Sequence, residues 1–290
     1  MWLLLSNPTS GGDKGRKYLH IIKEFLDEMN LSYRDITSSS NESASIALKK
    51  SLQDEDGNIT GVIVIGGDGM VHLAVQQLAK TNIPLALIPA GTGNDFARSL
   101  NLPLDAPLQL LGTYLATSPI HLDLGQVNDK IFADILSTGF DSVVNERANS
   151  MRIIRGRMKY NIAILLELST FEPKSYEFRV DSVSFTTKAM LIAVSNGISY
   201  GGGMKVTPHA KLDDGLFDIM VFGPVSKIEF LKVFPKVFSG GHISHPAVKI
   251  LRGKEVSITS DAVAYADGER IGNLPITAKV MPKALLTWRL

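Results

Sequence analysis

The sequence predicts an α/β nucleotide-binding domain with a parallel, doubly wound sheet, followed by a second β-rich, sandwich-like domain. Strand-like and helical segments alternate through residues 1–120, the pattern of a parallel sheet with crossover helices. Beyond this point most strand-like segments follow one another through short polar turns, which indicates antiparallel pairing. We therefore expect one domain over residues 1–120, possibly joined by residues 278–290, and a second over residues 121–277.

In the first domain, short apolar runs bounded by glycine or polar residues predict strands, and apolar residues at helical spacing predict helices. The helix expected from about Lys14 to Met29 puts Tyr18, Ile22 and Leu26 on one stripe. The expected elements are, in order, strand Trp2–Ser6, helix 14–29, strand Tyr33–Ile36, a helix ending at Leu52, strand Gly61–Ile65, helix 70–80, strand Leu85–Ile88 and a helix opening after Gly93.

The second domain reads as a series of strands that two helical segments interrupt, at about 142–169 and 225–238. The tail, Ile276–Leu290, is also strand-like. The other expected strands are His121–Val127, Lys130–Ser137, Tyr176–Val180, Val183–Thr187, Ala189–Asn196, Phe217–Phe222, Glu255–Thr259 and Val263–Ala266.

Composition narrows the functional classes. The chain has 290 residues, 44% of them hydrophobic, which is enough to bury a sizeable core. A net charge of +1 gives no indication of nucleic-acid binding. The absence of cysteine excludes disulfides and thiolate metal sites. The apolar start, residues 1–5, is too short for a signal peptide, and no apolar run reaches the ~18 residues that a membrane span needs.

Two glycine-rich loops follow two of the apolar strands. The first strand runs into Gly66-Gly67-Asp68-Gly69, and about twenty residues later a second runs into Gly91-Thr92-Gly93-Asn94-Asp95. Glycines let backbone N–H groups approach a phosphate closely. Ligands of open α/β sheets bind outside the carboxyl ends of the strands. The sequence therefore predicts a phosphate site at this edge of the sheet.

These loops belong to an ordered set of motifs that resembles the diacylglycerol/sphingosine-type lipid kinase family. The set comprises residues 7–12 (NPTSGG), 66–69 (GGDG), 89–98 (PAGTGNDFAR), 212–218 (LDDGLFD) and 267–269 (DGE). The resemblance implies a lipid kinase of phospholipid biosynthesis that uses ATP and Mg²⁺ and has diacylglycerol as its leading acceptor. It also implies a cytoplasmic protein in transient contact with the inner membrane surface, and a tail that returns to the first domain. No motif fixes the oligomeric state.

The resemblance assigns catalytic roles to Asp68 and Glu269. Asp68 is expected near Mg²⁺ and the attacking hydroxyl, and Glu269 is the candidate general base for that hydroxyl. The two carboxylates compete for the role of base, and we favour Glu269, with Asp68 as the organiser on the metal side. The alternative for Glu269 is an ordinary hairpin turn, because Asp267-Gly268 is a strong turn sequence.

The resemblance also predicts the nucleotide and metal ligands. Thr37 is the weaker nucleotide candidate, since a threonine at this place can equally cap a helix. A second, structural Mg²⁺ is expected at the Asp214 carboxylate and the backbone carbonyls of Lys211 and Leu216. The expected nucleotide-binding residues are Asn7, Thr9, Ser10, Gly11, Thr37, Gly66, Gly67, Asp68, Gly69, Met70, Gly91, Thr92 and Asn94.

Two residues depart from the family pattern, and they leave other readings open. Met70 replaces a frequent threonine, although its backbone N–H is still expected to reach a phosphate, and Leu73 replaces a frequent glutamate. They are the only support for one alternative, a non-catalytic lipid- or nucleotide-binding relative. The other alternative is an NAD-kinase-like enzyme, which shares GGDG and the two-domain plan. A basic segment with Arg152, Arg155, Arg157 and Lys159 is either a solvated face or a contact to anionic lipid headgroups.

Overall fold

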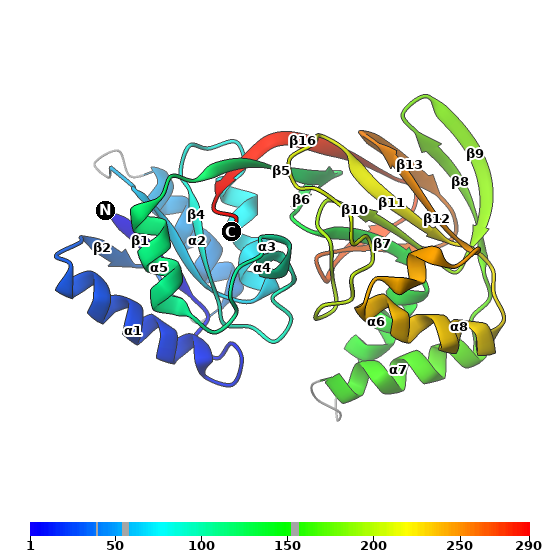
Figure 1. The fold of residues 1–290 in the computed structure, drawn as a ribbon, viewed down its shortest axis with the longest axis horizontal. Helices are drawn as coiled ribbons and strands as arrows, with labels where there is room; N and C mark the ends of the chain where they lie inside the picture. Colours follow the sequence, from blue (N-terminus) through cyan, green and yellow to red (C-terminus); the bar gives the residue numbers. More distant parts are fainter. Residues whose placement is uncertain (39, 54–57, 152–156) are drawn as a thin grey trace.

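The first 120 residues build a parallel sheet between helices (Figure 1). The computed structural model describes residues 1–38, 40–53, 58–151 and 157–290, without the side chains of residues 149 and 157–161. The elements of this part are β1 (Trp2–Ser6), α1 (Lys14–Glu28), β2 (Tyr33–Asp35), α2 (Asn41–Gln53), β3 (Gly61–Gly66), α3 (Asp68–Leu78), β4 (Leu85–Pro89), α4 (Asp95–Ser99) and α5 (Pro107–Ala116).

The strand order in this part is β2-β1-β3-β4, and all neighbouring strands pair in parallel. From β1 the chain crosses outward to β2 and then back to β3 on the other side. The loops that follow β1 and β3 therefore diverge, and a crevice for a ligand forms where the strand order reverses. The predicted parallel, doubly wound arrangement is confirmed.

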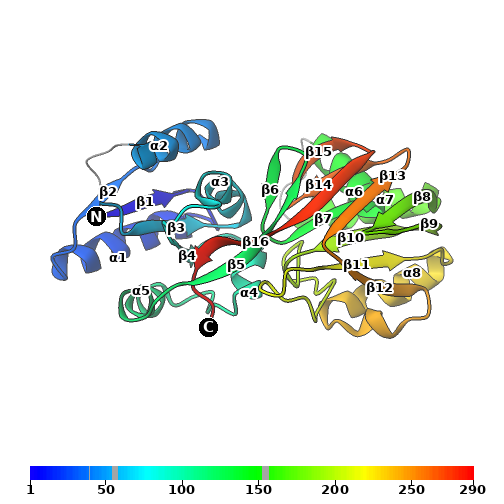
Figure 2. The same ribbon diagram turned by 90° about the horizontal axis from the view of Figure 1, so that it is seen from above.

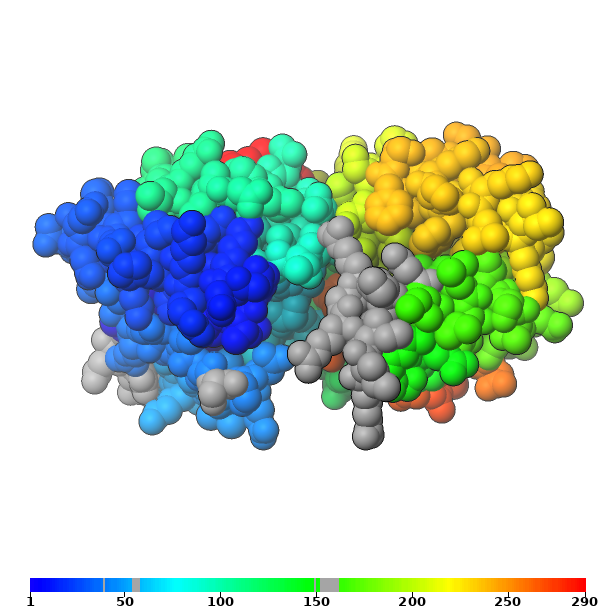
Figure 3. Space-filling model, turned by 90° about the horizontal axis from the view of Figure 1, so that it is seen from below, coloured from blue at the N-terminus to red at the C-terminus, as the bar shows by residue number. Residues whose placement is uncertain are grey.

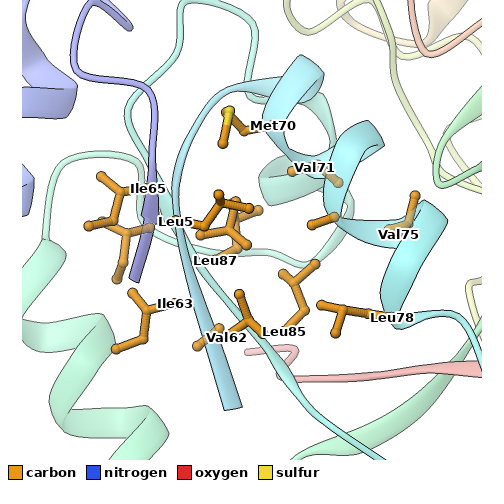
Figure 4. Close-up of a cluster of buried hydrophobic side chains, with 14 of the residues drawn as sticks. Leu5, Val62, Ile63, Ile65, Met70, Val71, Val75, Leu78, Leu85 and Leu87 are labelled. Atoms are coloured by element: carbon orange, nitrogen blue, oxygen red, sulfur yellow. The ribbon is translucent and has the colours of Figure 1, made fainter. Parts of the chain in front are cut away.

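Helix α3 packs one apolar face against this sheet. Figure 4 shows Leu78 of α3 turned toward Leu85 of β4, in a cluster that also contains Val71, Val75 and Leu87. All five side chains are buried. Strands with both faces covered read as continuous apolar runs, which is why the sequence identified β3 and β4.

The second part of the chain is dominated by antiparallel strands, as predicted. Helices α6, α7 and α8 lie together on one side of it (Figure 1). Its elements are β5 (Ile120–Val127), β6 (Lys130–Phe132), β7 (Ile135–Gly139), α6 (Phe140–Ser150), α7 (Arg157–Thr170), β8 (Lys174–Val180), β9 (Val183–Ala189), β10 (Leu191–Ser195), β11 (Phe217–Phe222), α8 (Lys227–Val233), the 3₁₀ turns η1 (Phe234–Phe238) and η2 (Gly241–Ser244), β12 (Val248–Gly253), β13 (Glu255–Thr259), β14 (Val263–Ala266), β15 (Glu269–Asn273) and β16 (Ile276–Thr287).

Strand β16 runs through both parts of the molecule (Figure 2). It pairs with β13 at its start and with β5 along most of its length, and its last residue, Thr287, pairs in parallel with Leu85 of β4. One sheet, β2-β1-β3-β4-β16-β13-β8-β9, therefore spans both parts, while β12-β11-β10-β7-β14-β15 forms a second sheet. The division at residues 120 and 277 stays a prediction, because a single sheet crosses it.

Several expected elements need correction. Helix α3 begins at Asp68 instead of Met70, because the chain turns helical directly after Gly67. The strand expected at Lys130–Ser137 is divided into β6 and β7. The helical segment expected at 142–169 forms two helices, α6 and α7. Strands β12 and β15 were not predicted at all. Among the described residues, no helix is both long and apolar enough to cross a membrane.

Candidate functional site

A pocket of about 280 Å³ opens at the carboxyl edge of the parallel sheet, where the strand order reverses. Nine of the thirteen predicted nucleotide-binding residues line it. The nine are Asn7, Ser10, Gly11, Gly67, Asp68, Gly69, Met70, Gly91 and Thr92. Asn41 and Gly93 complete the lining. Asn41 escaped the prediction because it begins a helix in an ordinary polar stretch.

The two glycine loops pack directly against each other in this pocket. A Cβ atom added to Gly91 would lie 2.5 Å from the Cα of Gly67, a distance that real Cβ atoms essentially never show. Asn94 then closes the second loop on itself, because its side chain donates to the Gly91 carbonyl and accepts from the Gly91 N–H, both at 2.9 Å. These glycines thus permit a contact between two backbones.

The Asp68 carboxylate joins the two loops. One oxygen accepts the Asn94 N–H at 3.0 Å, and the other accepts the Asp95 N–H at 2.7 Å. Burial, together with the negative charge of Asp95, raises the pKa of Asp68 to about 6, although these N–H bonds oppose the shift. A carboxylate that is held at a pocket wall and destabilised by its neighbours is well suited to attract a cation.

Asp95 connects the second loop to the other part of the chain. Its carboxylate accepts the N–H groups of Gly202 and Gly203 at 2.8 and 2.7 Å, and the Ser199 hydroxyl at 3.1 Å. These partners lie in the connection between β10 and β11. The signature residues 89–98 therefore shape the pocket and also fasten it to the second part of the molecule.

Asp267 holds the chain between β6 and β7 in place, close to His72 of α3. Its carboxylate accepts the N–H groups of Ala133, Asp134 and Ile135 at 2.7–3.2 Å, and His72 Nδ1 lies 3.7 Å from it. This bonding leaves residues 133–134 outside the strands and separates β6 from β7.

Asp134 is the most deeply buried carboxyl of the group. It accepts the Ser99 hydroxyl at 2.7 Å, and burial together with Asp267 and Asp95 raises its pKa well above the ordinary value. Asp68, Asp95, Asp134 and Asp267 thus form a carboxylate cluster between the two parts of the chain.

Glu269 lies on the rim of a different pocket. This second pocket, of about 460 Å³, is lined by Glu146, Tyr265, Gly268, Glu269 and Arg270. Glu269 is exposed and begins β15, directly after a tight turn in which Asp267 and Gly268 have positive φ angles of 49° and 85°. The backbone at residues 267–269 therefore forms the hairpin turn that was the alternative expectation for this motif. Asp267 lines neither pocket, and its charge adds to the rise in the pKa of Asp68.

Four predicted nucleotide residues do not line the first pocket. Thr9 is exposed and bonds the Asn7 side chain through its hydroxyl and its N–H. Thr37 lies at the end of β2, where its N–H donates to Asp35. The other two are Gly66 and Asn94, which are buried behind the wall.

Met70 lines the first pocket, and its N–H donates to the Gly67 carbonyl at 3.0 Å. The contact of this N–H with a phosphate stays a prediction. The side chain of Met70 packs over Gly66, while Leu73 is buried in the core.

The predicted metal loop, residues 211–216, is already bonded within the chain. Asp214 accepts the Leu216 N–H at 3.1 Å and forms an ion pair with Arg252. Lys211 is exposed. Among the described residues, no cluster of three or more acidic, histidine or cysteine side chains is placed to hold a metal ion. A cation bound to Asp214 must therefore compete with the Arg252 guanidinium.

The basic segment lies outside the described residues: Arg152 and Arg155 fall in the undescribed stretch, and nothing is described of the side chains of Arg157 and Lys159.

The two parts of the chain match two protein families. Residues 1–127 match the diacylglycerol kinase catalytic domain, and residues 134–288 match the YegS C-terminal NAD kinase β-sandwich-like domain. A diacylglycerol kinase of Mycobacterium tuberculosis (strain ATCC 25618 / H37Rv) is 40% identical over 235 residues, which cover 79% of this chain and 76% of the relative. A diacylglycerol kinase of Bacillus subtilis (strain 168) is 28% identical over 278 residues, covering 94% and 90%.

Solved structures share the fold. A diacylglycerol kinase from Bacillus anthracis str. Sterne superposes with a TM-score of 0.73 at 22% identity, covering 100% of this chain and 96% of the other. A second crystal structure from the same organism gives a TM-score of 0.81 at 23% identity. At these identities the likeness establishes the architecture.

Proposed function

Since the chain belongs to the diacylglycerol kinase family of lipid kinases, we propose that it transfers the γ-phosphoryl group of ATP to the hydroxyl of diacylglycerol. The observation that supports this most is the pocket in which Asp68 holds together two glycine loops at the carboxyl edge of a parallel sheet. Phosphoryl transfer depends mainly on positioning and on neutralising charge, and this pocket offers backbone N–H groups beside a carboxylate.

In this proposal the first pocket takes the nucleotide. The Ser10-Gly11 turn, the Gly67–Gly69 turn and the Gly91–Gly93 turn surround the space for the phosphates. Asn41 stands at the start of α2 on the same pocket and is a further polar contact for the nucleotide. Gly66 and Asn94 act behind this wall by holding the loops in shape, and the exposed Thr9 holds the Asn7 side chain. Thr37 remains a candidate on the adenosine side.

Mg²⁺ would be held on the Asp68 side of the pocket and would supply positive charge against the triphosphate. The residues fit this ion, because Asp68 presents a carboxylate at the pocket wall and the negative charge of Asp95 lies close to it. Asp95 adds to that charge but uses its own oxygens on the loop from Ser199 to Gly203. The chain itself contributes a fixed Asp68, which its two backbone donors prevent from rotating.

Glu269 is proposed as the general base. The second pocket presents its carboxylate to an acceptor that approaches from the side of α6. The proton of the lipid hydroxyl passes to Glu269 as the hydroxyl oxygen bonds to the γ-phosphorus, and the bond from that phosphorus to the bridging oxygen of ADP breaks. The product, a phosphorylated diacylglycerol, is a precursor for phospholipid biosynthesis at the membrane surface.

A competition among acceptors tests the proposal. Purified protein is supplied with Mg·ATP radiolabelled in the γ-phosphate, together with diacylglycerol, sphingosine, ceramide and NAD. The proposal expects label in a lipid product, with diacylglycerol the preferred acceptor. Label in NAD alone would support the NAD-kinase-like alternative, and ATP binding without any transfer would support a non-catalytic relative.

A further inference from the structure

A solvent-facing apolar ridge lies on α8 and the turn after it. Five of the twelve large hydrophobic side chains exposed among the described residues are on α7, α8 and η1. Ile228 and Leu231 of α8 are 69% and 47% exposed, and Phe238 of η1 is 51% exposed. Leu165 and Leu166 of α7 are 62% and 51% exposed.

The side chains of this ridge do not pack in the core. Helix α8 buries its opposite face, where Phe230 and Val233 pack in the core beneath it and Phe230 stacks on Phe222 and Phe234. Ile228 and Leu231 are one helical turn apart on the outward face. The start of α8 is fastened to the end of α7 by a hydrogen bond from the Lys227 ammonium to the Ser169 carbonyl. This bond places the start of α8 beside the end of α7.

Lysines flank the ridge. Lys227, Lys232 and Lys236 are all exposed, against a single acidic residue in the segment 226–239, Glu229. A carboxylate oxygen of Glu229 lies 3.2 Å from His245 Nε2. Apolar side chains surrounded by lysines match an anionic bilayer, because the former enter the acyl boundary while the latter meet the headgroups.

The α7–α8 region lies on the same face of the molecule as the N-terminal region. Viewed from below, the blue N-terminal region with α1, the green region with α7 and the yellow-orange region with α8 all face the viewer (Figure 3). The turn that precedes α1 carries Ser10 and Gly11 of the pocket wall.

We propose that the α7–α8 face, defined by Leu165, Leu166, Lys227, Ile228, Leu231, Lys232, Lys236 and Phe238, docks the protein on an anionic lipid bilayer. This inference rests on the proposed lipid kinase function. A diacylglycerol acceptor stays embedded in the bilayer, so a face that settles on the lipid brings the protein to its acceptor.

Vesicle sedimentation tests the docking face. The wild type is expected to bind vesicles of phosphatidylcholine with phosphatidylglycerol and to bind pure phosphatidylcholine much more weakly. The double variants Ile228→Asp/Leu231→Asp and Lys232→Glu/Lys236→Glu are each expected to bind the anionic vesicles about tenfold more weakly. Helix α2 supplies matched controls, Ile46→Asp and Lys49→Glu/Lys50→Glu, which should stay within about twofold of the wild type because the same changes occur away from the face.

Kinase assays on the same variants separate this inference from the proposed function. With diacylglycerol in vesicles, the α8 variants should lose about tenfold in rate, whereas a short-chain, water-soluble diacylglycerol should be phosphorylated at the wild-type rate. Wild-type vesicle binding by both α8 variants would overturn the docking face even if lipid is phosphorylated. Loss of vesicle binding by these variants would sustain it even if the wild type phosphorylated no lipid.

Discussion

The Asp68 carboxylate accepts the backbone N–H of Asp95 at 2.7 Å, and the Asp95 side chain in turn accepts backbone N–H groups 107 and 108 residues further along the chain. The residue expected to organise the metal and the residue that fastens the two parts of the molecule are thus adjacent and negatively charged. Charge in the pocket and the arrangement of the two parts are coupled through this contact.

The first prediction concerns pH. Burial and Asp95 raise the pKa of Asp68 from 3.8 to about 6, so its charged form prevails only above this value. The kcat/KM for Mg·ATP should therefore fall as the pH drops through about 6. A rate that stays constant down to about pH 5 would show that the ionised form of Asp68 is not required.

The same shift predicts a stability effect with a definite sign. Folded Asp68 binds its proton more tightly than the unfolded chain does, so this group's contribution to stability is lost as the pH rises from 3.8 through about 6. Asp68→Asn cannot ionise, and its melting temperature relative to the wild type should be higher at about pH 8 than at about pH 5.

The second prediction concerns the contact between the glycine loops. Gly91→Ala places a Cβ 2.5 Å from the Gly67 Cα, so the loops must separate. We expect Mg·ATP affinity to fall at least about tenfold, together with a lower melting temperature. Gly112→Ala in α5 is the matched control, because a Cβ there meets nothing within 4 Å. Calorimetric titration of both variants with Mg·ATP checks this, and unchanged affinity in Gly91→Ala would contradict the placement of the phosphates.

The third prediction assigns the base. Glu269→Gln keeps size and hydrogen bonding but cannot accept a proton, so kcat should fall by about 10²–10⁴ while Mg·ATP affinity changes little. Glu146→Gln alters another carboxylate of the same pocket and should remain within a few fold of the wild type. Asp68→Asn should impair nucleotide binding as well as turnover. If Glu269→Gln turns over lipid at the wild-type rate, Asp68 becomes the preferred base.

The fourth prediction concerns the structural Mg²⁺. If a cation binds at Asp214, a chelator should lower the melting temperature of the wild type and have no effect on Asp214→Ala, because the variant has already lost the site. If Arg252 is the only cation that pairs with Asp214, the chelator should change the melting temperature of neither protein. Thermal denaturation with and without chelator distinguishes the two cases.

Much of the fold could be predicted because the sequence patterns that indicate it involve neighbouring residues. The buried strands Gly61–Gly66 and Leu85–Pro89 are continuous apolar runs, and each is followed by its glycine turn. The strand β15, in contrast, has the sequence ERIGN, whose charge and glycine hide its pairing with β14. The break between β6 and β7 depends on Asp267, which lies more than a hundred residues away.

The site was predictable to a similar extent. Glycine turns and the acidic residues beside them are recognisable in the sequence, so most residues of the pocket wall were predicted. The Asn94 side chain bonds the Gly91 backbone within its own loop, and the Met70 N–H bonds the Gly67 carbonyl. Both bonds depend on backbone geometry that the motif does not encode. The bonds from Asp95 to Gly202 and Gly203 depend on tertiary structure, and no pattern near Asp95 reveals them.

The most direct test of the account is the rate of phosphatidic acid formation from diacylglycerol in anionic mixed micelles with Mg·ATP, measured for the wild type and Asp68→Asn side by side. The account predicts steady product formation by the wild type and none above background by the variant, with both proteins folded by circular dichroism. Equal product formation by the two proteins, or no lipid product from the wild type alongside phosphorylated NAD, would contradict it.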